Sequence, residues 1–327
     1  MDKILTVSIA AYNVERYIES ALVPFMNADI IDMLEIFVID DGGNDSTLAL
    51  AEKYRARYPQ SIKLVHKENG GWGSTVNYGI EHATGKYFKQ LDGDDYFSAE
   101  VLPQFVSYLK NVDCDLVYTP YTIFDDLTNR VIDVKYISND FQKMKVYDIL
   151  DINKYIALNM HNCTFKTSLL KTDVNILEHC FYTDVEYMIK ALAKVKTVVF
   201  NDLNIYQYRV ARSGQSMSIE GLRKHYREHE KVTISLLDFY YKAEVPANLR
   251  QIIKARIKEM VESQYMLFLY LDPNKIHKTE LIDFDVMIRD DFSEFYDISV
   301  SRIIFLRRIG FWGYSLVAKN TQRKIME

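Results

Sequence analysis

The stretch "GKYFKQLDGDDYF" (residues 85–97) places a cluster of aspartates immediately after an apolar run that predicts a β-strand. Asp92, Asp94 and Asp95 are separated only by Gly93. Carboxylates this close repel one another, so a positive or hydrogen-bonding partner is expected beside them. The simpler interpretation is a solvated turn, because Asp and Gly are common turn residues. The sequence on either side has to decide between the two.

The residues before this stretch alternate between strand-like and helix-like periods. Strands are predicted at 4–12, 34–40, 62–67 and 86–92, and helices at 13–26, 46–58 and 74–84. We expect Asn13 to cap the first helix, Asn44 or Asp45 to cap the second, and Gly85 to terminate the third. Strand and helix repeating every 25–30 residues or so are typical of an α/β fold with a parallel sheet covered by helices.

All four predicted strands end in polar or glycine-rich sequence. These ends are "AYN" (11–13), "DDGGND" (40–45), "ENGGWG" (68–73) and "DGDD" (92–95). Open parallel sheets bind ligands in the crevice beyond the carboxyl ends of their strands, and all four ends would face that crevice. This convergence favours a ligand site over a solvated turn.

Composition places the chain among folded soluble proteins. Its 327 residues are 48% apolar and 26% charged, with a net charge of −5 that gives no indication of nucleic-acid binding. The three cysteines are widely spaced, as expected for free thiols in a reducing compartment. The N-terminus predicts a first strand and not a signal peptide, and no apolar run approaches the ~20 residues of a spanning helix. We therefore expect a cytoplasmic protein.

The pattern loosens after residue 100. Helices are predicted at 100–111, 148–159 and 182–195, and strands at 114–124 and within 197–210. Thr183 and Glu186 have capping-box spacing at the start of the helix at 182–195. From about 220 the chain is helical and charged, so we predict a domain boundary near 218, with 1–218 as the catalytic domain and 219–327 as a helical C-terminal region.

Several kinds of ligand site are missing from these strand ends. No GxGxxG follows the first strand, and no P-loop, EF-hand loop or nucleophile elbow is present. What remains is an acidic strand end without a glycine-rich phosphate loop, which suits a divalent cation. Mg²⁺ or Mn²⁺ binds one or two carboxylates together with substrate phosphates, and would bring a diphosphate to a pocket that otherwise repels it.

Taken together, these motifs resemble the inverting family-two glycosyltransferases with the GT-A fold. The matching pieces are "VSIAAYNVERYI", "VIDDGGNDST", "ENGGWGSTVNYGIEHATGKYFKQLDGDD" and the "TD" pair at 183–184, spread over roughly the first 220 residues. The resemblance implies a Rossmann-like, mostly parallel sheet flanked by helices. It also implies an enzyme that moves a sugar from a nucleotide-diphosphate donor, with Mn²⁺ or Mg²⁺ as cofactor.

The resemblance also implies roles for individual residues. Tyr12 and Asp41 would hold the pyrimidine with Glu15 nearby, and Asp184 at the head of a helix would act as general base. In the DXD motif, Asp92 would face the ribose, Asp94 would bind the metal and Asp95 would support the loop. The expected nucleotide-binding residues are Ala11, Tyr12, Asn13, Glu15, Asp41, Asn69, Gly70, Asn77, Asp92 and Gly93. Taken alone, Asp184 would be interpreted as a helix-dipole residue.

Further candidates have equally good structural interpretations. Trp72 could stack on a sugar or anchor packing, and His161 could line the acceptor pocket or be a core histidine. Arg212, Gln215 and Ser216 resemble the family's closing loop, for which the alternative is a solvated loop. Many relatives carry Arg at the position of Val76, so one diphosphate contact stays unassigned.

The last thirty residues are strongly basic. Residues 298–327 carry a net charge of +5, and "RIIFLRRIGFWGYSLVAK" (302–319) predicts an amphipathic helix. Such a helix can lie on an anionic membrane, in which case the protein would sit peripherally at its inner face. The alternatives are a helix docked on the catalytic domain and a homodimer contact.

The sequence therefore predicts a metal-dependent inverting glycosyltransferase that uses a nucleotide sugar, preferentially UDP-linked. Its acceptor would be a glycan or a lipid-linked molecule in the synthesis of surface polysaccharide of the cell envelope. Two alternatives stay open: a sugar nucleotidyltransferase on a related sheet, and a nucleotide- or glycan-binding relative without catalysis.

Overall fold

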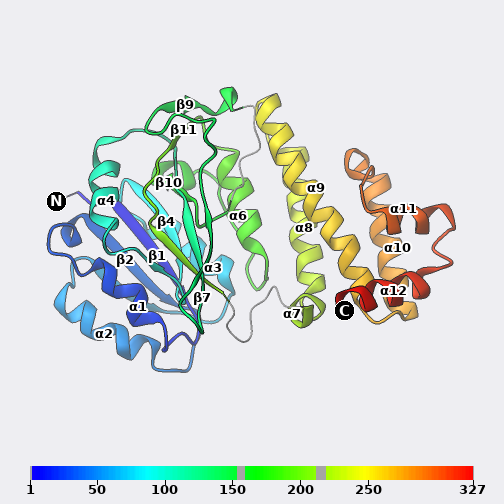
Figure 1. Cartoon of the computed structure of the whole chain (residues 1–327), viewed down its shortest axis with the longest axis horizontal. Helices are drawn as coiled ribbons and strands as arrows, with labels where there is room; N and C mark the ends of the chain where they lie inside the picture. The colour runs from blue at the N-terminus through cyan, green and yellow to red at the C-terminus, as the bar shows by residue number, and fades with distance from the viewer. Residues whose placement is uncertain (1, 153–158, 211–218, 327) are drawn as a thin grey trace. The chain divides into compact units, whose positions relative to one another are not determined.

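The computed structural model describes residues 2–152, 159–210 and 219–326 of the chain, with side chains up to residue 323 (Figure 1). The chain divides into two compact units, Met1–Ser213 and Gly214–Glu327. The boundary predicted at 218 lies outside the described residues.

The N-terminal unit is built on an eight-stranded sheet with the order β3-β2-β1-β4-β10-β6-β11-β9. Its strands are β1 Leu5–Ala11, β2 Leu34–Asp40, β3 Ile62–His66, β4 Tyr87–Asp92, β6 Leu116–Tyr118, β9 Val146–Asp148, β10 Cys163–Lys166 and β11 Thr197–Phe200. Strands β1 to β4 lie parallel, β10 is antiparallel to both β4 and β6, and β9 is antiparallel to β11. The prediction of a mostly parallel central sheet is confirmed.

Helices cover both faces of this sheet. Figure 1 shows α1 Ile18–Leu22, α2 Thr47–Arg57 and α4 Leu102–Asn111 on one side, and α3 Trp72–His82 and α6 Thr183–Leu192 on the other. The shorter helices are η1 Val23–Phe25, η2 Ile31–Met33, η3 Ile149–Asp151 and α5 Thr167–Leu170. Because β1 pairs with both β2 and β4, the strand order reverses beside β1, and this is where open α/β sheets form their ligand crevice.

The central strands are buried on both faces because helices cover both faces, although polar side chains such as Ser8 are among those buried. In β1, Leu5, Val7 and Ile9 are fully buried, and the whole of β2 is buried. Helix α3 approaches β1 closely through Gly79, where a Cβ would lie 2.4 Å from Ser8 Oγ. This packing fixes the strand ends from which the polar loops emerge.

A second, four-stranded sheet has the order β5-β12-β7-β8. Its strands are β5 Tyr96–Phe97, β7 Tyr121–Asp125, β8 Val131–Lys135 and β12 Tyr206–Val210. Strand β12 pairs with β5, which directly follows the aspartate cluster. The prediction of one strand over 114–124 is wrong, because β6 and β7 belong to different sheets and Pro120 between them has no N–H for a ladder.

The predicted helix starts are partly wrong. The first helix begins at Ile18 and not at Asn13, which has a left-handed φ of 53° and accepts a hydrogen bond from the Asn44 N–H (2.9 Å). Asp45 does accept from Thr47 N, the first residue of α2 (3.0 Å). Helix α3 ends before Gly85, where a Cβ would lie 2.6 Å from Thr6 N; that glycine permits close packing on β1.

The capping box predicted at the start of α6 is absent. Tyr182 precedes the helix in a left-handed conformation, and no cap bond is made by its side chain. Glu186 instead accepts a hydrogen bond from Leu177 N (2.8 Å), since tertiary packing buries its carboxylate completely. Of the helix predicted at 148–159, the described part forms only η3, and residues 153–158 lie outside the described residues.

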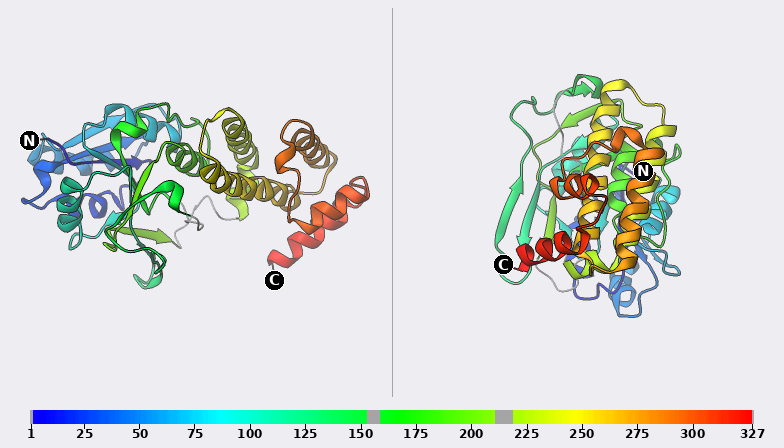
Figure 2. Two further views of the ribbon diagram at one scale, coloured as in Figure 1. Left: turned by 90° about the horizontal axis from the view of Figure 1, so that it is seen from above. Right: turned by 90° about the vertical axis from the view of Figure 1, so that its right-hand side faces the viewer.

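The described residues of the C-terminal unit form helices alone, drawn from yellow-green to red in Figure 2. These are α7 Ile219–Lys224, α8 Tyr226–Lys242, α9 Ala247–Tyr270, α10 Lys275–Asp290, η4 Ser293–Phe295, α11 Ser301–Arg308 and α12 Tyr314–Met326. The long helix α9 packs against α8, α10 and α12. No helix in the described ranges has both the length and the hydropathy to cross a membrane.

The amphipathic helix predicted over 302–319 is interrupted. Helix α11 ends at Arg308, and Gly310 and Phe311 both take left-handed φ values (61° and 60°) before α12 begins. The tail packs within its own unit, since Tyr314 donates its hydroxyl to Phe268 O in α9 (2.9 Å).

Candidate active site

The loops after β1 and β2 are tied together by side chain to backbone hydrogen bonds. The Asn13 side chain accepts from Asn44 N, and Glu15 Oε2 accepts from Ser46 N, both at 2.9 Å. Asp41 N donates to Ala11 O (2.8 Å). Tyr12 stands out from this framework with 55% of its surface exposed. The framework thus presents one aromatic ring to solvent at the rim of the sheet.

The buried Asp41 carboxylate organises the glycine-rich loop after β3. Its Oδ1 accepts from Lys67 Nζ (2.7 Å), Gly70 N (2.9 Å) and Ser74 Oγ (3.2 Å), and its Oδ2 from Gly71 N (2.8 Å). A carboxylate has about four acceptor sites, two on each oxygen. Oδ2 therefore keeps capacity for one further donor.

Asn69 closes the same loop onto the end of β2. Its side-chain amide donates to Asp41 O (2.9 Å). Gly42 faces this contact, since a Cβ there would lie 2.9 Å from Asn69 N. Gly70 is buried and its N–H donates to Asp41. Asn69 and Gly70, both predicted to bind the nucleotide, therefore also fix the shape of this loop.

The aspartate cluster is held by hydrogen bonds from helix α3, strand β1 and strand β12. Trp72 Nε1, at the start of α3, donates to Asp92 Oδ1 (2.8 Å). Gly93 N donates to Ala10 O (2.8 Å), and a Cβ at Gly93 would lie 2.8 Å from that same oxygen. The turn can therefore approach β1 only with glycine at this position.

Strand β12 supplies further partners. The buried Asp95 carboxylate accepts from the Tyr206 hydroxyl (2.8 Å) and from Arg209 N (2.7 Å). The Arg209 guanidinium donates to Asp94 O (2.7 Å) and to Asp126 Oδ1, and it lies over the ring of Tyr17. These contacts give the repelling carboxylates the hydrogen-bonding and positive neighbours that the sequence required.

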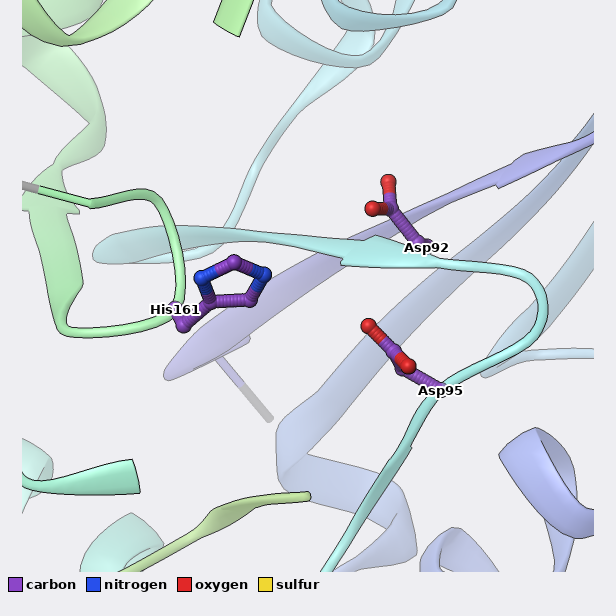
Figure 3. A group of neighbouring side chains, drawn as sticks. All are labelled: Asp92, Asp95 and His161. Carbon is purple, nitrogen blue, oxygen red and sulfur yellow. The ribbon is translucent and has the colours of Figure 1, made fainter. Parts of the chain in front are cut away.

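A possible metal-binding group lies between β4 and β10. Figure 3 shows Asp92 and Asp95 facing the imidazole of His161, and one ligand atom from each of the three lies within 4.8 Å of the others. His161 sits among three tyrosine rings, with centroids 4.9 Å from Tyr121, 4.8 Å from Tyr206 and 4.3 Å from Tyr208. The aromatic surroundings fix the ring that faces the carboxylates.

The electrostatics of this group suit a cation. Burial and the charges of Asp94 and Asp92 raise the pKa of Asp95 well above its usual range. Burial, and secondarily the charge of Lys89, lower the pKa of His161 to about 3, so its imidazole is neutral and has a lone pair to offer. Two carboxylates and a neutral imidazole form a donor set that Mn²⁺ accepts readily.

Asp184 lies in the same electrostatic environment as the aspartate cluster. It is exposed in the first turn of α6. The pKa of the half-buried Tyr208 phenol is raised first by burial, and then by the charges of Asp95, Asp92, Asp94 and Asp184. The fold therefore places carboxylates that are about ninety residues apart in sequence within electrostatic reach of one phenol.

Asn77 is hydrogen-bonded to the segment before α6. Its amide donates to Ile176 O (2.8 Å) and Glu178 Oε1 (3.0 Å), and its carbonyl accepts from Ile176 N (2.9 Å). Both amide protons are thus used to hold the segment before α6. Asn77 thus positions this segment, and its contact with the nucleotide stays a prediction.

Trp72 and His161 are half-buried at the site, with Trp72 also packed edge-on against Tyr187 at 6.2 Å. Arg212, Gln215 and Ser216 lie outside the described residues. Four residues of the site were not predicted from the sequence: Lys67, Tyr206, Tyr208 and Arg209. Lys67 could have been predicted, because it directly follows strand β3 at the ligand-binding edge of the sheet. No local sequence pattern predicts a role for the three residues of β12.

The sequence profile described as glycosyl transferase family 2 matches residues 6–176. This is more than half of the chain, which therefore belongs to glycosyl transferase family 2. The predicted family and enzyme class, a glycosyltransferase, are confirmed.

Curated relatives agree with this assignment. The chain is 25% identical over 313 residues to the Bacillus subtilis "Minor teichoic acid biosynthesis protein GgaB", covering 89% of this chain and 34% of GgaB. It is 29% identical over 223 residues to an uncharacterized glycosyltransferase of Mycoplasma pneumoniae, covering 66% of this chain and 71% of that protein. The chain thus spans about a third of the length of GgaB.

Solved structures share the fold at low sequence identity. Staphylococcus aureus TarS 1–349 in complex with UDP superposes with a TM-score of 0.64 at 17% identity, covering 99% of this chain and 91% of that one. The Pyrobaculum calidifontis mannosyltransferase PcManGT, in complex with GDP-Man and Mn²⁺, gives 0.57 at 14% identity, covering 100% and 89%. These likenesses establish the GT-A type fold.

Proposed function

We propose that the protein is a metal-dependent inverting glycosyltransferase that transfers a sugar from a UDP-linked donor to a glycan or lipid-linked acceptor. The observation that carries this proposal is that the charge of Asp184 and the charges of Asp92, Asp94 and Asp95, at the carboxyl end of β4, all act on the Tyr208 phenol. One carboxylate stands at the head of a helix, and the others stand at the carboxyl end of the sheet.

The donor nucleotide would lie on the rim between the first two strand ends. Tyr12 offers an exposed ring for stacking, and Asp41 Oδ2 can accept one N–H from a pyrimidine base. The choice of UDP draws support from TarS, whose structure holds UDP. The assignment to surface polysaccharide synthesis draws support from GgaB and its part in teichoic acid biosynthesis.

Asp184 would act as the general base. Inversion requires the acceptor hydroxyl to attack the anomeric carbon on the side opposite the leaving diphosphate, and its proton must pass to a nearby base. The Asp184 side chain is exposed, so an acceptor can reach it, and the helix N-terminus favours its anionic form. The nucleoside diphosphate leaves as the glycosidic bond forms, with no covalent enzyme intermediate.

The residues present fit a divalent cation. Asp92, Asp95 and His161 would hold it, with Asp94 as the ligand that the family resemblance implies. Mn²⁺ suits the imidazole better than Mg²⁺ does. When bound, such an ion stabilises negative charge on the leaving diphosphate. The Trp72, Tyr206 and Arg209 hydrogen bonds keep the carboxylates in place for this purpose.

The test begins with thermal-shift measurements on UDP-, GDP- and dTDP-sugars, with Mn²⁺ and with chelator. We expect stabilisation by one UDP-sugar that chelator abolishes. Release of UDP should then fall about 100-fold or more in Asp184→Asn, because a general base contributes a factor of that order. A loss of similar size is expected in Asp94→Ala, because this variant removes the metal ligand that the resemblance implies. Asp202→Asn, an exposed carboxylate elsewhere in the unit, is the matched control. Unchanged turnover in both site variants would overturn the proposal.

A further inference from the structure

Four large apolar side chains are exposed together in the segment 301–323. Phe305 is 51% exposed, Ile309 37%, Trp312 89% and Leu316 67%. Their exposure does not reflect poor packing of the segment, because other apolar side chains of the same segment are buried. The buried side chains are Ile303, Leu306, Phe311, Tyr314 and Ala318.

The turn that presents Trp312 is held by backbone geometry. Gly310 and Phe311 are both left-handed, and Phe311 N donates to Leu306 O (2.8 Å). Ile309 folds back over the turn, because a Cβ on Gly313 would lie 3.1 Å from its Cδ1. Trp312 thus occupies the bend between α11 and α12, with Ile309 beside it.

Contacts inside the unit fix this segment in place. Arg307 donates to Asp285 (2.7 Å) and to Tyr296 O (2.8 Å), and lies over the Tyr296 ring at 3.8 Å. The Tyr314 hydroxyl donates to Phe268 O. The exposed apolar set is therefore carried on a preorganised element, so little conformational entropy is lost when it is covered.

The charge of the segment indicates what covers it. Residues 301–323 include five basic side chains and no acidic one, in a chain of net charge −5. Arg307 pairs with Asp285, whereas Arg302, Arg308, Lys319 and Arg323 form no ion pair with the carboxylates that the structure describes. Apolar side chains flanked by uncompensated positive charge complement a surface that is apolar inside and anionic outside.

We propose that segment 301–323 binds the surface of an anionic phospholipid bilayer, with Trp312, Leu316, Phe305 and Ile309 entering the headgroup region. Tryptophan favours this interface because its ring is apolar and its N–H is polar, and the basic side chains would meet lipid phosphates. A second copy of the chain is a poorer occupant, because a self-complementary contact would place like charges opposite one another.

Co-sedimentation of the full chain tests the proposal, using phosphatidylcholine vesicles with and without phosphatidylglycerol. We expect binding to the anionic vesicles that weakens with added salt, and a loss of about tenfold in Trp312→Ala and in Arg308→Glu. Leu127→Ala, an apolar side chain exposed to 81% in the other unit, and Lys242→Glu are the matched controls and should bind as wild type. Thermal melts of each variant show whether it is folded.

The position of Trp312 can be read directly, because the chain has only two tryptophans. In a Trp72→Phe background, Trp312 emission should shift to the blue and be quenched by brominated lipid when vesicles are added. Equal binding of Trp312→Ala and wild type, or an emission that vesicles do not change, would overturn the proposal. A change of oligomeric state in Trp312→Ala without any vesicle binding would do so too, and would assign the face to a homodimer.

Discussion

Gly73, in the first turn of α3, gives the sharpest test of how the site is assembled. A Cβ built on it would lie 2.1 Å from Leu177 O and 3.0 Å from Ile176 Cγ2. Ordinary contact begins at 3.4 Å, so in Gly73→Ala the segment 176–177 must recede by about 1.3 Å. This segment leads into α6, whose first turn carries Asp184.

We expect Gly73→Ala to fold, with a loss of about 1–3 kcal/mol in the free energy of unfolding, the usual cost of overpacking. We expect a much larger effect on catalysis. Displacement of a reacting group by about 1 Å can cost on the order of 100-fold in rate, so kcat for UDP release should fall by about that factor. The KM for the donor should change less, because Asp41 contacts Gly70 N and Gly71 N and not the segment 176–177.

The assay is steady-state UDP release with saturating Mn²⁺, alongside thermal unfolding. Gly79→Ala is the matched control: it lies in the same helix, and its Cβ would lie 2.4 Å from Ser8 Oγ in β1 rather than against the segment before α6. If the two variants lost similar stability and Gly73→Ala kept kcat within about threefold of Gly79→Ala, the coupling between α3 and Asp184 would be refuted.

Other predictions address the partners of the site and the helical unit. Tyr206→Phe removes a hydroxyl donor from the buried Asp95 and should cost about 1–3 kcal/mol in the free energy of unfolding by denaturant titration; an unchanged value would show that water replaces it. His161→Ala should raise the Mn²⁺ concentration needed for half-maximal activity by about tenfold or more, and equal metal titrations would remove this residue from the ligand set. Burial lowers the pKa of His229 from 6.5 to about 4, although its hydrogen bond to Gln264 opposes this. Below about pH 6.5 the His229 imidazole is protonated in the unfolded chain but stays neutral in the folded chain. The free energy of unfolding should therefore fall by about 3 kcal/mol in all as the pH drops from about 6.5 to about 4. His229→Leu should flatten that part of the profile in pH-dependent unfolding; an identical slope in both proteins would contradict the assignment.

The sequence by itself determined the order of strands and helices in the first hundred residues. The runs at 5–11 and 34–40 are mostly apolar because both faces of the sheet are covered, and that pattern is contained in neighbouring residues. The polar strand ends followed from the same reasoning, since parallel strands end at one edge. The aspartates at the end of β4 could therefore be named without a structure, whereas Asp184 was named only through the resemblance to the family.

Only the tertiary structure decided what surrounds those carboxylates. Tyr206 and Arg209 reach Asp95 through the pairing of β12 with β5, more than a hundred residues away, and no local period encodes such a pairing. Tertiary packing also overrode two caps that the sequence favoured, because Asn13 accepts a hydrogen bond from the loop after β2 and Glu186 accepts one from Leu177 N, in the segment before α6. Periodicity is a property of adjacent residues, whereas the partners of a buried charge depend on which elements the folded chain brings beside it.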